Sequence, residues 1–130
     1  MTLASIRDYI KTLGVGEHFS IGKIDVNKEK SIGVYQRPDY SNAQTQLGGQ
    51  VNTKTKVKHI SILIHWNKNA KETEANAETL YEALLNATNV TIDSQPVNYI
   101  DLRMPEPADL GTDDLGIYER VIWADFYFQK

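Results

Sequence analysis

The sequence predicts a single α+β domain, in which two main α-helices pack on one mixed or antiparallel β-sheet. Apolar side chains recur at three- and four-residue steps near residue 3 and again after residue 69, the period of an amphipathic helix. Between and after these segments, apolar side chains alternate with the two-residue period of a strand. The chain has 130 residues and no internal repeat, which fits one domain over residues 1–130.

The two helices are expected over residues 2–13 and 69–87. Gly14 follows the first segment, where a left-handed cap would end a helix. The second segment begins with Asn69 and Glu72, which have the spacing of a capping box. The first apolar stripe consists of Leu3, Ile6, Tyr9, Ile10 and Leu13. The second consists of Ala77, Leu80, Tyr81, Leu84 and Ala87.

Two long strands are expected over residues 57–66 and 117–128. Both carry apolar side chains on both faces, which favours the centre of a sheet. We therefore expect them to be neighbours in one sheet, covered by the second helix. Shorter strands are expected at residues 18–24, 31–36, 90–92 and 97–102. The polar residues 25–30 then predict a hairpin loop, and residues 93–96 predict a turn.

Two segments without a clear period are expected to be loops. Residues 37–53 begin with Arg37-Pro38-Asp39 and contain Gly48-Gly49 among polar residues. Residues 104–116 hold two prolines, two glycines and three aspartates. A loop as long as the first is usually functional or mobile in a compact domain.

The amino-acid composition excludes several kinds of site and classes of protein. The absence of cysteine excludes disulfides, thiolate metal sites and a cysteine nucleophile. A net charge of −3 provides no basic face for gripping DNA phosphates, and Lys54, Lys56 and Lys58 alternate like one solvated strand face. No apolar run approaches the roughly 20 residues that cross a bilayer.

No residue pattern predicts a catalytic site, a bound metal or a cofactor. His59 and His65 share a strand face but lie about 20 Å apart, too far to hold one ion. Asp109, Asp113 and Asp114 lack the calcium-loop signature and read as a turn before the last strand. Neither a phosphate-loop motif nor G-x-S-x-G occurs.

The C-terminal aromatic residues leave two interpretations open. Core packing explains most of them. Trp123 and Tyr127, however, share a strand face with Glu119 and Asp125, and such a mixed aromatic and acidic face could instead be an intersubunit surface.

Several segments resemble a known family. They are residues 6–10, 30–35, 47–49, the strand and helix from Ile60 to Ala77, and Gly111 to Glu119 with the aromatic strand that follows. The chain resembles the minor capsid protein family of phages and prophages of Gram-positive bacteria, which is similar to the tail terminator proteins of long-tailed phages. The likeness spans nearly the whole chain, although no single motif is diagnostic.

The resemblance implies a virion structural protein and not an enzyme. Such a protein is a subunit of a ring, commonly a hexamer, at the head-proximal end of the tail tube. The implied partners are further copies of the chain, the major tail tube protein and the head connector or head completion protein. DNA passes through the ring without specific binding, and no membrane is involved. The location is the head–tail junction of the virion, after synthesis in the host cytoplasm.

The expected assembly surface combines the first loop, the acidic turn and the aromatic strand. Its residues are Tyr40, Gln46, Leu47, Gly48, Gly49, Asp109, Asp113, Asp114, Trp123 and Tyr127. Two other functions stay open. One is a head completion or neck protein, distinguished by its binding partner. The other is a small cytosolic enzyme or ligand-binding domain, which would need a deep pocket with convergent polar groups.

Overall fold

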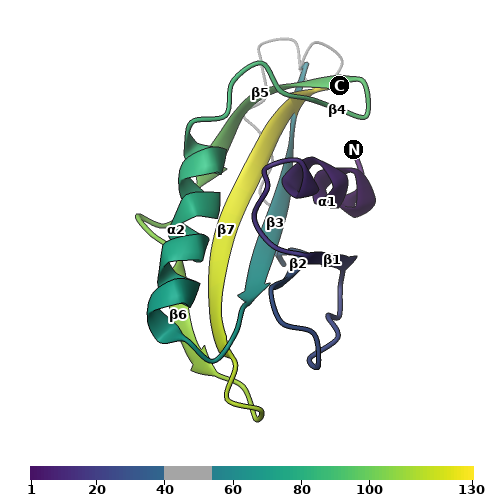
Figure 1. Cartoon of the computed structure of the whole chain (residues 1–130). Helices are drawn as coiled ribbons and strands as arrows, with labels where there is room; N and C mark the ends of the chain where they lie inside the picture. The colour runs from purple at the N-terminus through teal and green to yellow at the C-terminus, as the bar shows by residue number, and fades with distance from the viewer. Residues whose placement is uncertain (40–53) are drawn as a thin grey trace.

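A computed structural model of the chain describes residues 1–39 and 54–130. These residues form two helices and a seven-stranded sheet, so the α+β prediction is confirmed (Figure 1). The elements in chain order are α1 (Leu3–Lys11), β1 (His18–Ile21), β2 (Ser31–Gln36), β3 (Thr55–His65), α2 (Ala70–Leu85), β4 (Thr91–Ile92), β5 (Gln95–Leu102), β6 (Ala108–Thr112) and β7 (Tyr118–Gln129). Neither helix is long and apolar enough to cross a membrane.

The centre of the sheet is the pair of long strands β3 and β7. The strand order is β1-β2-β3-β7-β5-β4, and β6 pairs with β7 outside this path. β3 and β7 are antiparallel over their whole length, from Thr55 opposite Gln129 to His65 opposite Glu119. The prediction that these two strands are neighbours is therefore confirmed.

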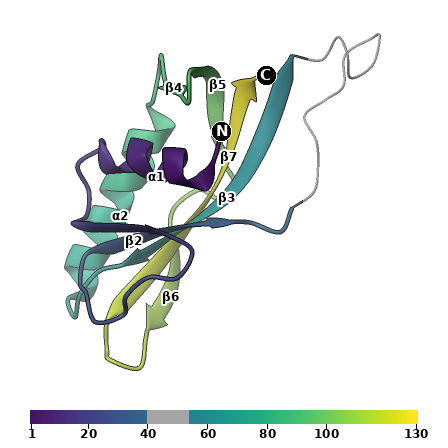
Figure 2. The same cartoon turned by 90° about the vertical axis from the view of Figure 1, so that its right-hand side faces the viewer.

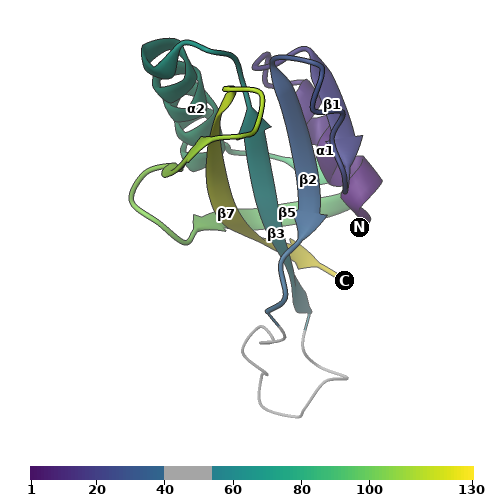
Figure 3. The ribbon, with the colours of Figure 1, turned by 90° about the horizontal axis from the view of Figure 1, so that it is seen from below.

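Both helices pack on the same face of the central strands (Figures 2 and 3). α1 contributes Ile6 and Ile10 to the core, and α2 contributes Ala77, Leu80 and Leu84. The strands contribute the buried set Ile32, Val34, Ile60, Ile62, Ile64, Ile122, Ala124 and Phe126. Among the described residues, this one-sided packing leaves the opposite sheet face without a helix.

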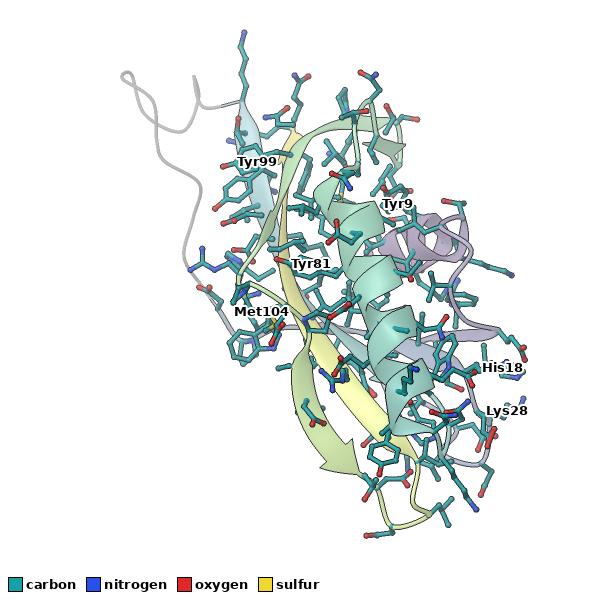
Figure 4. The ribbon with its side chains drawn as sticks, turned by 60° about the vertical axis from the view of Figure 1, so that its left-hand side comes forward. Tyr9, His18, Lys28, Tyr81, Tyr99 and Met104 are labelled. Carbon is teal, nitrogen blue, oxygen red and sulfur yellow. The ribbon has the colours of Figure 1, made fainter. Side chains whose placement is uncertain are left out.

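Each helix begins at a polar cap. Thr2 caps α1 and forms a capping box with Ser5. Asn69 caps α2 by accepting a 3.0 Å hydrogen bond from the Glu72 amide. The Glu72 side chain accepts a 3.4 Å hydrogen bond from the Trp66 indole, which ties the start of α2 to the residue after β3. Farther along α2, the Tyr81 hydroxyl donates to the Met104 carbonyl at 2.7 Å (Figure 4).

The prediction of a hairpin between the first two strands is wrong, because β1 and β2 are parallel. His18 lies opposite Ser31, and Ile21 lies opposite Val34. β1 ends at Ile21 and the chain turns at Gly22, whose φ is +71°. It then runs back so that β2 starts beside the start of β1. A parallel pair needs such a crossover, whereas a hairpin would have placed the start of β2 beside the end of β1.

The prediction that residues 104–116 form only a loop is also wrong, because β6 lies within them. Ala108 pairs with Val121 and Thr112 pairs with Tyr118, with an irregularity between Asp109 and Gly111. Gly111 adopts a φ of +79°, as a bulge often requires. The bulge interrupts the two-residue alternation, and the segment's prolines precede the strand, so no strand period is visible in the sequence. The predicted turn at 93–96 is confirmed only in part, because residues 93 and 94 join β4 to β5 whereas Gln95 and Pro96 already belong to β5.

Candidate functional site on the open face of the sheet

The open face is the side of β3 and β7 turned away from the helices. It is lined by alternate residues that are directly opposite each other across the two strands. These pairs are His59 and Asp125, Ser61 and Trp123, Leu63 and Val121, and His65 and Glu119. Leu63 and Val121 are half-buried, and Trp123 is 44% exposed. The middle of this face is therefore apolar and partly accessible, with a charged cluster on either side.

One cluster is centred on Asp125, which is only 1% exposed. Its Oδ1 accepts a hydrogen bond from Arg37 Nη2 at 2.6 Å and lies 2.7 Å from His59 Nδ1. The same Arg37 nitrogen donates to Asp39 Oδ2 at 3.1 Å. The Arg37 guanidinium thus bridges the two carboxylates and joins the end of β2 to β3 and β7.

Aromatic side chains extend this cluster toward the surface. The Arg37 guanidinium lies 5.5 Å from the centre of the Trp123 ring, within the range of a cation–π interaction. Tyr99 of β5 stacks on Tyr127 with ring centres 4.6 Å apart, and Tyr99 is 55% exposed. Burial raises the pKa of Tyr127, and Tyr99 and Asp125 raise it further. Its phenol therefore stays protonated at neutral pH.

The second cluster lies at the other end of β3 and contains His65, which is fully buried. His65 Nδ1 is 2.9 Å from Glu119 Oε2 and 3.6 Å from Asp113 Oδ2. The other ring nitrogen, Nε2, is 3.0 Å from the Val26 carbonyl. Asp113 also fixes its own turn, since Oδ1 accepts from the amides of Leu115 and Ile117 at 2.9 Å each.

The sequence correctly separated His59 from His65 but missed the carboxylates beside each of them. Both histidines have acidic partners far along the chain, 66 residues away for Asp125 and 54 for Glu119. The register of β3 against β7 would have revealed these partners, because His59 and His65 lie directly opposite the two acids on β7. The apolar pattern predicts that the two strands are neighbours, but it does not determine their register.

The predicted assembly residues lie in different places. Asp109 and Asp114 are exposed near the turn that joins β6 to β7, and Asp113 is half-buried there. Trp123 and Tyr127 lie on the open face. Asp113 and Asp114 thus lie in the turn before β7, and Trp123 and Tyr127 lie on β7 itself. Tyr40, Gln46, Leu47, Gly48 and Gly49 lie outside the described residues.

A hollow of 380 Å³ lies between α1 and residues 17–31, away from the open face. Its lining is charged, with Arg7 beside Asp8 at 3.1 Å and Lys30 3.7 Å from Glu17 nearby. His18 and Lys28 project at the surface there (Figure 4). These charges pair with one another and do not converge on one point, unlike the polar groups of a small-molecule site.

A comparison with known protein families shows to which family the chain belongs. Residues 6–129 match the model of the bacteriophage tail terminator protein. The chain belongs to the bacteriophage tail terminator family. This confirms the predicted resemblance to tail terminator proteins and supports a structural role in the tail of a phage virion. A search of curated proteins finds no match.

Proposed function

We propose that this family member is a subunit of a ring that caps the phage tail tube and joins it to the head. We further propose that the open sheet face forms part of the contact between neighbouring subunits. The observation that carries the proposal is a sheet face that no helix of the described residues covers and that exposes a tryptophan, in a chain of the tail terminator family.

The chemistry of the open face supports an interface between proteins. Exposed aromatic residues and arginine are enriched at interface centres, and Trp123 lies beside Arg37 here. Half-buried Leu63 and Val121 adjoin Trp123 across the two central strands. If this face meets a different face of the next identical subunit, repetition of the contact closes a ring, and a hexamer is the size we propose.

The remaining contacts follow from the ring. We propose that the acidic turn with Asp109, Asp113 and Asp114, together with residues 40–53, meets the tail tube protein or the head connector or completion protein. A subunit with a net charge of −3 suits a channel through which DNA passes without tight binding.

The test is electron microscopy of phage particles assembled without this gene. We expect tail tubes longer than normal that fail to join heads, and restoration of both by the wild-type gene supplied in trans. Tails of normal length that stay unattached would instead favour a head completion role. Tails of normal length joined to heads would contradict both.

A further inference from the structure

Three metal-binding side chains converge at one end of the open face. His65 Nδ1, Asp113 Oδ2 and Glu119 Oε2 all lie within 4.8 Å of one another. They come from the end of β3, the turn before β7 and the start of β7. The distances from His65 Nδ1 are 2.9 Å to Glu119 Oε2 and 3.6 Å to Asp113 Oδ2.

The contacts of His65 allow its Nδ1 atom to serve as a metal ligand. A neutral imidazole has a single N–H, and Nε2 lies 3.0 Å from the Val26 carbonyl, an oxygen that only accepts. With the proton on Nε2, the lone pair of Nδ1 faces the carboxylate of Glu119. Asp113 Oδ2 is also buried and has no hydrogen-bond donor among the described residues. Two carboxylate oxygens and one ring nitrogen therefore face the same point, where either a proton on Nδ1 or a metal ion in its place supplies positive charge.

The cluster around Asp125 contains an arginine, whereas the described residues place none in contact with Asp113 or Glu119. Around His59, the Arg37 guanidinium contacts both Asp125 and Asp39 and supplies the positive charge. Around His65, the ion pairs that the described part of the chain gives Asp113 and Glu119 are both with the histidine itself. Arg120, the nearest arginine in sequence, instead pairs with Glu74 and Asp109.

We propose that His65 Nδ1, Asp113 Oδ2 and Glu119 Oε2 bind a divalent transition-metal ion of the Zn²⁺ class. In a tetrahedral zinc site with nitrogen and oxygen ligands, neighbouring ligand atoms are about 3.3 to 3.5 Å apart, which the distances of 2.9 and 3.6 Å bracket. The Val26 carbonyl holds the second ring nitrogen, as an outer-shell partner does in known histidine sites.

The ion would join three separate parts of the chain. His65 lies at the end of β3, the two carboxylates lie in the turn before β7 and at the start of β7, and Val26 lies in the crossover between β1 and β2. The carboxylates are partly accessible, with side-chain exposures of 16% for Asp113 and 19% for Glu119. A fourth ligand, such as water, can therefore approach from solvent. This inference does not rest on the role of the chain in the tail.

The experiment is calorimetric titration of tag-free, chelator-treated full chain with ZnCl₂. We expect one ion per chain with a dissociation constant in the micromolar range or below. Zinc at about 100 times that constant should raise the melting temperature by about 5 °C or more. Titration with Co²⁺ should produce the visible absorption of a low-symmetry site, and Mg²⁺ should not displace it.

Asp113→Asn is the decisive variant, because an amide keeps the Oδ1 acceptor that fixes the turn and loses the carboxylate ligand. We expect it to weaken zinc binding by more than the roughly 10- to 100-fold cost of losing an outer-shell partner. Asp114→Asn, a change of the neighbouring exposed carboxylate, is the matched control and should bind zinc like the wild type. Glu119→Gln is a second ligand variant in case the first fails to fold.

Three outcomes would overturn the proposal. One is the absence of zinc and cobalt binding to the folded wild-type chain. Another is equal binding by wild type, Asp113→Asn and Glu119→Gln, which would place the ion elsewhere. The third is nitrogen-15 NMR of His65 that shows both ring nitrogens protonated at pH 7 in excess zinc, because an imidazolium cannot be a ligand.

Discussion

Asp125 holds the open face together through both carboxylate oxygens, since its Oδ2 also lies 3.7 Å from Arg103 Nε. Arg37 and His59 both reach its Oδ1, at 2.6 and 2.7 Å, and Arg37 is itself only 7% exposed. A buried ion pair adds little stability compared with an apolar pair of the same shape, but removal of one partner leaves the other charge buried without compensation. The side chain of Asp125 should therefore be far more sensitive to substitution than the surface acids.

We predict that Asp125→Asn lowers the free energy of unfolding by about 3 kcal/mol, because the Arg37 charge stays buried. Urea denaturation of the purified variant measures this loss. Asp8→Asn is the matched control, since exposed Asp8 pairs with Arg7 at 3.1 Å and such pairs contribute at most about 1 kcal/mol. Equal losses in the two variants would contradict the assignment of Asp125 as the centre of the cluster.

A second prediction concerns alkaline pH. Burial raises the pKa of Tyr9 above its usual 10.0, where its ring packs edge-on against Phe126. Above about pH 10 the unfolded phenol loses its proton while the folded one keeps it, so the folded state binds more protons and stability falls as pH rises. Chemical denaturation of wild type and Tyr9→Phe from about pH 9 to 11 should show a smaller fall in the variant. An identical fall would exclude Tyr9 as a cause.

Among the secondary-structure elements, α2 offers the clearest local test. Its N-terminal amides depend on Asn69, whose side chain accepts from the Glu72 amide at 3.0 Å. Asn69→Ala should lower the free energy of unfolding by about 1 kcal/mol, as measured by thermal or urea denaturation. Asn69→Asp should retain nearly full stability, because a carboxylate caps a helix N-terminus equally well. A destabilised Asn69→Asp variant would show that the amide nitrogen has a role of its own.

The accuracy of the sequence-based fold varies by element for physical reasons. α1, α2, β3 and β7 were predicted because their apolar periods are long and each buries one continuous stripe. The parallel pairing of β1 was missed because local polarity in residues 25–30 does not record where the chain returns. β6 was missed because the irregularity near Gly111 breaks its alternation.

The candidate site was predictable only in part for a related reason. Trp123 and Tyr127 share a strand face with Asp125, which follows from the two-residue period alone. The grouping of Asp113 and Glu119 around His65 depends on the register of two strands far apart in sequence. A shift of one residue would have moved Glu119 to the helix-covered face.

At the scale of the whole molecule, the open face should matter for assembly and not for folding. We predict that Trp123→Ser leaves the melting temperature within a few degrees of wild type, because the ring is 44% exposed. The variant should still fail to restore normal tails in phage that lack the gene. Leu85→Ser is the matched control, because Leu85 is 54% exposed on α2, away from this face, and should restore them. Restoration by both variants would remove Trp123 from the proposed contact.

The position of β7 has a consequence for how the chain is made. This strand forms hydrogen-bonded ladders with β3, β5 and β6. Thr55 of β3 pairs with Gln129, so this end of the ladder cannot form until Gln129 has been synthesised. Pairings of such long sequence separation fold slowly, on a scale of milliseconds to seconds. During translation β3 can pair with β2, but its other edge stays open until β7 emerges from the ribosome. Nascent chains should therefore recruit chaperones until this strand is synthesised, because an unpaired strand edge invites pairing with other chains.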